Sequence, residues 1–223
     1  MSVKKSIVLS ALLSLAAAGS SSQAATVGFG ADIPARTVVW NDLSTQVAVG
    51  SLVWVGTFTS EAFSMGSGTI AANVTTIQTA GGWTQFTGSS TLGISSVLGN
   101  SKVGGSVTDN VETAFNTKPV YLWIFNAAST GAASQMGIFK ATSANPAWTF
   151  PTQANGVGDT VTLSTDPAPN TTFATIAAVG TTPVGAASTT QLVLAAPVPE
   201  PAALTFGVLG ILAVAGSRRR KRQ

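Results

Sequence analysis

The chain has 223 residues, of which 45% are hydrophobic and only 9% charged, and it contains neither cysteine nor histidine. This composition excludes disulfide scaffolds, thiolate or imidazole metal sites, cysteine nucleophiles and Ser-His-Asp catalysis, because the required side chains are absent. The net charge of +3 arises from the two ends, which hold seven of the eleven Lys and Arg residues. Residues 25–197 retain four cations against seven carboxylates, so we expect no nucleic-acid partner.

Residues 1–24 have the features of a secretory signal peptide. Lys4 and Lys5 precede an apolar run over residues 6–19, which small polar residues follow. Cleavage between Ala24 and Ala25 is favoured because it places the small side chains of Ser22 and Ala24 at positions −3 and −1, which a signal peptidase recognises. We therefore predict an exported protein whose mature chain begins at Ala25. The alternative is an uncleaved anchor, but the apolar run is shorter than the ~20 residues that a membrane span needs.

Residues 25–180 are predicted to form an all-β ectodomain, an antiparallel β-sandwich of the jelly-roll-like kind. They are rich in Thr, Ser and Gly, which disfavours helices and favours short strands joined by tight turns. Residues 159–165 alternate between polar and apolar, as in a half-buried antiparallel strand. Residues 120–125 are apolar on both faces, which predicts a central strand. Further strands are expected at residues 37–40, 52–59, 136–141, 147–150, 173–179 and 191–195.

One short helix is predicted over residues 109–116, where Asp109 and Glu112 have the spacing of a capping box. Oxygen atoms in this segment are candidate Ca²⁺ ligands, but their spacing matches no established calcium loop. We predict no metal and no cofactor. The sparse carboxylates show no acid/base pair, so a non-enzymatic protein is expected and an extracellular hydrolase is the least favoured alternative. The small, polar residues of 181–197 are interpreted as a linker.

The aromatic residues allow two interpretations. Trp83 and Trp148 lie among Gly, Thr and Pro residues, so they are the candidates for flat, exposed surfaces that stack on sugar rings. The alternative for all five tryptophans is that they fill the core, because aromatic side chains supply large buried areas.

The last residues form three parts in order. Three prolines within Pro197–Pro201 keep the chain extended, and residues 202–216 then form an uncharged run. As a helix this run would be about 22 Å long, short of a hydrocarbon core of ~30 Å, which makes it a marginal membrane anchor. Five cations follow, and the positive-inside rule retains them in the cytoplasm with the body outside. They are Arg218, Arg219, Arg220, Lys221 and Arg222.

This arrangement resembles the PEP-CTERM sorting signal of Gram-negative bacteria over residues 198–223. The resemblance implies that Pro199, Glu200 and Pro201, preceded by Val198, form the recognition motif. It implies a membrane helix over residues 202–216 and a stop-transfer cluster over residues 218–222. The body also resembles uncharacterised ectodomains that precede such tails, through Tyr121–Asn126 and two later aromatic segments.

The resemblance implies that the protein is a substrate of exosortase, a membrane enzyme that is thought to cut near the motif. Signal peptidase and, transiently, the inner membrane are the other expected partners. Because such systems accompany extracellular polysaccharide production, the expected function is that of an exported surface or extracellular-matrix protein associated with polysaccharide. A carbohydrate-binding module that uses exposed aromatic side chains is the alternative.

Overall fold

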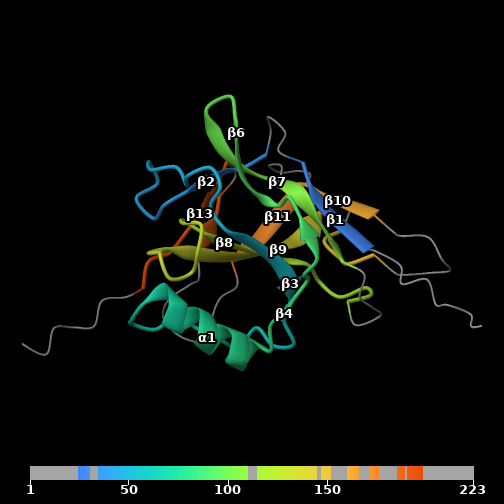
Figure 1. Cartoon of the computed structure of the whole chain (residues 1–223), viewed down its shortest axis with the longest axis horizontal. Helices are drawn as coiled ribbons and strands as arrows, with labels where there is room; N and C mark the ends of the chain where they lie inside the picture. The colour runs from blue at the N-terminus through green and yellow to red at the C-terminus, as the bar shows by residue number, and fades with distance from the viewer. Residues whose placement is uncertain are drawn as a thin grey trace, which may run out of the picture.

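The computed structural model describes residues 25–30, 35–109, 115–144, 147–151, 160–165, 171–175, 185–188 and 190–197. Within these residues the chain is mostly β, with thirteen strands and one helix (Figure 1). The strands form two five-stranded sheets, sheet I and sheet II, and a three-stranded sheet III. The prediction of a β-rich body is confirmed.

Sheet I is organised around one long strand, β7, which changes partners along its length. The first half of β7 pairs with β6 as an antiparallel hairpin, and its second half pairs with β1 on one side and β5 on the other. β10 lies on the far side of β1. The strands are β1 (Ala25–Phe29), β5 (Ser89–Ser90), β6 (Gly93–Val97), β7 (Asn100–Asp109) and β10 (Thr160–Leu163).

The strand expected at residues 159–165 is present as β10, but its predicted antiparallel pairing is wrong. Leu163 is buried while Thr160 and Thr162 are exposed, as the alternation predicts. β10 nevertheless runs parallel to β1, with Thr26 opposite Thr160 and Phe29 opposite Leu163. The alternation reports only which face is buried, and both strand directions give the same alternation.

Sheet II has the order β11-β9-β8-β3-β4 and is antiparallel throughout. All five residues of β8 are buried, which confirms the central strand predicted from its two apolar faces. Leu122 and Ile124 enter a first core shared with sheets I and III, whereas Trp123 and Phe125 enter a second core on the opposite face. The strands are β3 (Val53–Thr57), β4 (Thr84–Gln85), β8 (Tyr121–Phe125), β9 (Met136–Ala144) and β11 (Thr171–Thr175).

Sheet III joins distant parts of the chain. β13 (Gln191–Val193) pairs in parallel with β2 (Thr37–Val39) and antiparallel with β12 (Ala186–Ala187). The side chains of Leu192 and Leu194 are almost fully buried in the first core. The interpretation of residues 181–197 as a linker is therefore wrong for the described part, residues 185–188 and 190–197, which belongs to the folded body.

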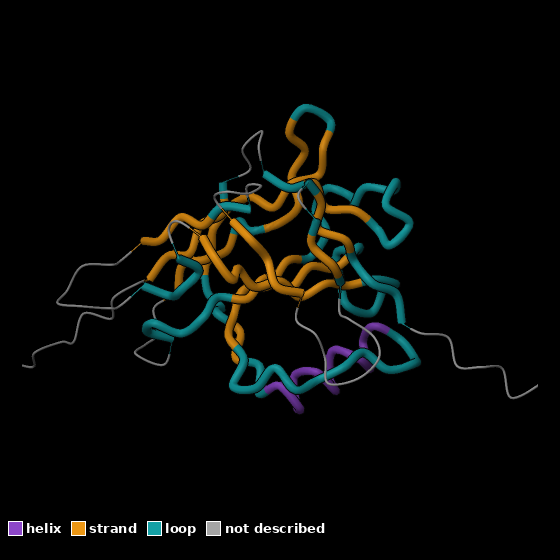
Figure 2. The backbone as a smooth tube through the Cα atoms, turned by 180° about the vertical axis from the view of Figure 1, so that it is seen from behind, coloured by secondary structure: helices purple, strands orange, loops and turns teal. Residues whose placement is uncertain are grey.

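The helix α1 (Ile70–Gly81) was not predicted, and it covers the second face of sheet II (Figure 2). Its buried residues Ile70, Val74 and Ile77 follow helical spacing and meet the aromatic side chains of the sheet. The hydroxyl of Thr69 accepts a hydrogen bond from the Ala72 N–H, which caps the start of the helix. Gly82, at a φ of 58°, ends it in the left-handed conformation that glycine adopts readily.

The structure also bears on the helix expected over residues 109–116 and on the strand expected over residues 147–150. Asp109 is the last residue of β7, so the helix expected over residues 109–116 does not begin there, and residues 110–114 lie outside the described part. Residues 147–150 do not form a strand of a sheet. They make an isolated bridge between Thr149 and Pro119 and bury Trp148 and Phe150.

Candidate functional site

The sequence predicts proteolytic processing on both sides of the described body, by signal-peptide cleavage before Ala25 and by cleavage near the motif that follows Pro197. Ala25 is the first residue of β1, is only 4% exposed, and pairs with Asp109. At the other end, the chain follows β13 to Ala195, which forms a bridge with Met136, and to Pro197. Ala25 and Pro197 are the first and last residues that the structure describes.

The predicted sorting residues themselves lie outside the described residues. These are Ala24, Val198, Pro199, Glu200, Pro201 and the basic cluster at 218–222, together with the apolar run 202–216. Among the helices that the structure does describe, none has the length and apolar character to cross a membrane.

Pro197 lies at the edge of a surface hollow of about 410 Å³. One wall is the start of α1, with Gly68, Thr69 and Ile70, and the other includes Ala133 and Ser134. The described chain thus ends beside the N-terminus of α1. Both walls are formed by small or apolar residues without charge, so this hollow contains no group for acid/base chemistry.

The candidate Trp148 is a core residue. It is 4% exposed, and its ring meets that of Phe29 edge-on with 5.2 Å between centroids. Its Nε1–H donates to the carbonyl oxygen of Ser164 at 3.2 Å, which satisfies the only polar group of the side chain. A ring held in this way has no free face for a sugar, so the expectation of a glycan contact at Trp148 is corrected.

Trp83 is also part of a packed aromatic cluster, although it is not fully buried. Its ring lies 4.7 Å from that of Phe58 and 5.4 Å from that of Trp123. Its Nε1 atom is buried and has no hydrogen-bond partner. The ring therefore packs against the second core while remaining partly exposed, and a glycan contact at Trp83 stays a prediction.

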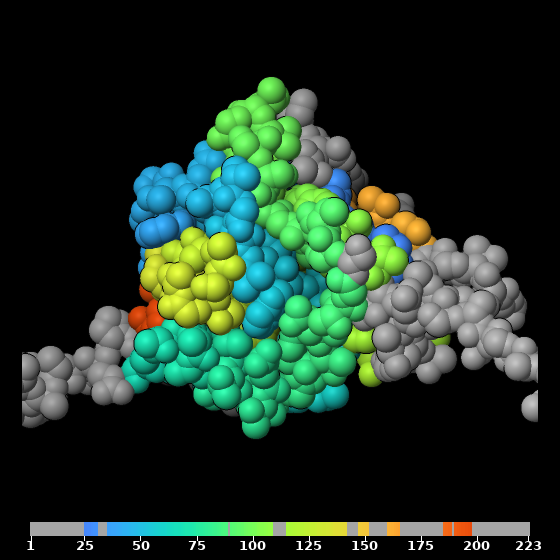
Figure 3. Space-filling model, in the orientation of Figure 1, coloured from blue at the N-terminus to red at the C-terminus, as the bar shows by residue number. Residues whose placement is uncertain are grey.

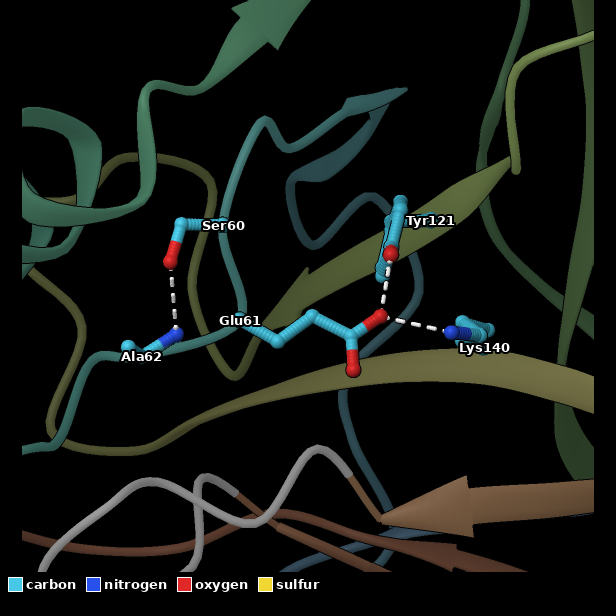
Figure 4. A network of polar contacts seen from close by, with 5 residues as sticks. All are labelled: Ser60, Glu61, Ala62, Tyr121 and Lys140. Atoms are coloured by element: carbon cyan, nitrogen blue, oxygen red, sulfur yellow. Dashed lines mark hydrogen bonds and ion pairs between the residues drawn. The ribbon is translucent and has the colours of Figure 1, made fainter.

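The structure brings together three polar side chains that the sequence did not single out as a group (Figure 4). Glu61 comes from the loop between β3 and α1, Tyr121 from β8 and Lys140 from β9. One carboxylate oxygen of Glu61 accepts hydrogen bonds from the Tyr121 hydroxyl and from Lys140 Nζ, the latter at 2.6 Å. The sequence separations of 60 and 79 residues leave no local motif that could have revealed the cluster.

The protonation of this cluster follows from its contacts. Partial burial alone would raise the pKa of Glu61, but the bonds from Lys140 and Tyr121 and the Lys140 charge outweigh burial and lower it. Burial, reinforced by Glu61, raises the pKa of Tyr121. At neutral pH Glu61 is therefore a carboxylate that accepts from the neutral Tyr121 hydroxyl and from Lys140 Nζ.

Apart from the Glu61 cluster, the described residues bring together few side chains that could catalyse a reaction or bind a metal ion. Within the described part of the chain, no three Asp or Glu side chains gather into a site for a metal ion. A second hollow, of about 500 Å³, lies between residues 49–53 and the foot of the β6–β7 hairpin and is lined by neutral side chains.

No family model, curated protein or solved structure matches this chain.

Proposed function

We propose that this protein is an exported, non-enzymatic surface or extracellular-matrix protein that exosortase processes through a PEP-CTERM tail. In this proposal the signal peptide directs export, Pro199, Glu200 and Pro201 are recognised, and the run 202–216 holds the chain in the inner membrane until processing. The product is then found at the cell surface or in the polysaccharide matrix. The finer fold proposed for its body is a β-sandwich, which the first core shared by sheets I and II supports.

The observation that carries the proposal is the position of residues 191–197. β13 and Ala195 are bonded into the body, and the three parts of the sorting signal follow in the sequence directly after Pro197. An enzyme that cuts near Glu200 would therefore release a body that keeps all its described strands. This division between a folded product and a removable tail is what a sorting signal requires.

The non-enzymatic part of the proposal rests on chemistry. The chain has no histidine or cysteine, and the two hollows described above are lined by neutral residues. The Glu61 carboxylate is paired with Lys140 and hydrogen-bonded to Tyr121. The lowered pKa of Glu61 and the raised pKa of Tyr121 agree with this pairing. With Trp148 buried in the first core and Trp83 packed against the second, a carbohydrate-binding module built on these two rings is the weaker candidate.

The experiment is intact-mass analysis and cell fractionation of the full chain expressed in its native host, compared with Glu200→Ala. The expected product begins at Ala25, lacks everything beyond the PEP region and is found outside the inner membrane. The variant is expected to accumulate with its tail intact in the inner membrane.

Glu61→Ala provides the matched control, because it removes a glutamate from the body rather than from the tail. It is expected to be processed like the unaltered chain. An intact C-terminus in both the unaltered chain and Glu200→Ala would contradict the proposal and leave the tail as an ordinary anchor.

A further inference from the structure

The described chain ends on one side of the body, where three segments come together (Figure 3). They are residues 41–49, residues 127–134 and residues 64–72, the last of which contain the start of α1. In Figure 3 these segments lie one below another on the left, in blue, yellow and teal, and the last described residues lie beside them in orange-red. We refer to the three segments together as the tail-side surface.

Contacts join the first two segments. The backbone N–H of Asn41 donates to Oε1 of Gln135, and Nε2 of Gln135 donates to Oδ1 of Asn41, both at 2.9 Å. Gln135 directly follows the segment 127–134, so these bonds hold that segment beside residues 41–49. Val49 and Ala128, one from each segment, also line the same hollow of about 500 Å³. The two segments therefore form one continuous surface.

The short stretch of chain before the proposed membrane run places this surface close to lipid. Pro197 lines the other hollow together with Ile70 of α1 and Ala133. Five Cα–Cα steps separate Pro197 from Ala202, the first residue of the run, and they span at most about 18 Å. The headgroup region on each side of a hydrocarbon core is about 5–7 Å thick. While the run is inserted, the tail-side surface is therefore the part of the described body closest to the lipid headgroups.

The charge of the tail-side surface suits such a position. Asp42 is the only charged residue in its three segments, although residues 25–197 as a whole hold seven carboxylates against four cations. The Asp42 carboxylate accepts hydrogen bonds from the backbone N–H groups of Ser44 and Thr45, at 2.9 and 2.8 Å, which fixes the turn that carries Leu43. A surface with a single carboxylate meets little repulsion from anionic lipids.

Exposed apolar side chains are concentrated on the same surface. The described residues include three large apolar side chains that are exposed, and Leu43 at 58% and Val49 at 63% are two of them. Leu43 also has a φ of 65°, a left-handed conformation that leucine rarely adopts, so its outward position carries a conformational cost. Exposed apolar groups mark surfaces that bind membranes or proteins. The length of the connection to Ala202 selects the membrane.

We propose that the tail-side surface rests on the membrane that holds the tail, with the side chains of Leu43 and Val49 in the headgroup region. The body then has one fixed orientation on the bilayer while the tail is processed. This inference rests on the proposed function, because it requires the run 202–216 to be inserted.

Single labelled cysteines test the orientation, because the chain has no cysteine of its own. The full chain is reconstituted into vesicles of phosphatidylethanolamine and phosphatidylglycerol as Leu43→Cys, Ala132→Cys and, as the matched control, Thr162→Cys. All three positions are exposed, and Thr162 belongs to β10, which lies on the opposite side of the body in Figure 1. Each thiol carries a fluorophore that nitroxide-labelled headgroups quench. Quenching is expected to be several-fold stronger at Leu43→Cys and Ala132→Cys than at Thr162→Cys.

A longer connection separates a true surface contact from simple tethering. A flexible Gly/Ser linker inserted after Pro197 allows the body to leave the bilayer. Quenching at Ala132→Cys is expected to persist with the linker and to fall several-fold when Leu43→Ser and Val49→Ser are added. Both substitutions are at exposed positions, so the melting temperature should stay unchanged.

Flotation of the vesicles distinguishes failure of this inference from failure of the proposed function. A chain that does not float with the vesicles contradicts the membrane role of residues 202–216 and overturns the orientation with it. A chain that floats, but whose three labels are quenched equally, overturns the orientation alone. Loss of quenching with the linker by itself, or quenching that survives Leu43→Ser and Val49→Ser, has the same meaning.

Discussion

Met136 and Ala195 exchange two backbone hydrogen bonds. The Met136 N–H donates to the Ala195 carbonyl at 3.0 Å, and the Ala195 N–H donates to the Met136 carbonyl at 2.8 Å. Together with the parallel pairing of β13 and β2, these bonds attach residues 191–195 to two sheets at once. The last described strand is therefore a structural part of the body, only a few residues before the proposed sorting motif.

Leu192→Ala is expected to lower the free energy of unfolding by about 2–5 kcal/mol, because it leaves a cavity where a fully buried leucine packs in the first core. Chemical denaturation of the purified protein measures this loss. Leu43→Ala is the matched control, since Leu43 is 58% exposed and its truncation should change stability by less than about 0.5 kcal/mol. Equal, small effects of both variants would return residues 191–195 to the role of a linker.

The sequence predicted those strands whose pattern is decided locally. β8 was identified because its residues are apolar on both faces, and β2, β3, β9 and β13 were found from short runs of β-forming residues. The parallel pairings of β1 with β10 and of β2 with β13 join segments more than 100 residues apart. Alternation within one strand carries no information about such partners or their direction.

The helix and the hairpin were missed for different physical reasons. α1 contains Thr, Val and Ile, which have low helix propensity, and the hydrophobic contact with sheet II outweighs that preference. The correct signals were a cap at Thr69, apolar residues with helical spacing and Gly82 at the end. The β6–β7 turn was missed because Leu98-Gly99 does not match the Asn-Gly pattern of two-residue hairpins.

The described part of the site was the least predictable. Rings flanked by small residues were taken as candidates for exposure, yet small neighbours also allow a large ring to be enclosed, as at Trp148. Glu61, Tyr121 and Lys140 meet only because β8 and β9 pair and the loop before α1 folds over them.

Thr69→Ala is expected to destabilise the protein by about 1 kcal/mol, because the Ala72 N–H loses the hydroxyl that caps α1. Thr79→Ala is the control at the other end of the helix. The Thr79 hydroxyl bonds only to the carbonyl of Thr75 one turn earlier, so its loss should be neutral or slightly favourable. Thermal unfolding of both variants distinguishes them, and an equal response would mean that the cap does not stabilise α1.

The Glu61 and Lys140 pair makes stability depend on pH in a defined direction. Because the folded-state pKa of Glu61 is lowered, its contribution is present above the unfolded-state pKa and is lost as the pH falls through the folded-state value. Both side chains are partly exposed, at 43% and 28%, so the coupling should be below about 1 kcal/mol.

A double-mutant cycle with Glu61→Gln and Lys140→Met measures this coupling. It is expected to be favourable at neutral pH, to weaken with added salt and to vanish in acid. A coupling that stays constant through the acid titration of Glu61 would show that packing, rather than charge, links the two residues.

Trp148 distinguishes most directly between a core role and a glycan platform. Trp148→Ala removes a ring packed against Phe29 and the Nε1–H group that donates to the Ser164 carbonyl, so we expect a loss of about 3–5 kcal/mol in the free energy of unfolding. Trp148→Phe keeps an aromatic ring but not the donor, and its smaller loss separates packing from the hydrogen bond. A surface platform behaves in the opposite way, because truncation there weakens polysaccharide binding in a pull-down and leaves the unfolding transition unchanged.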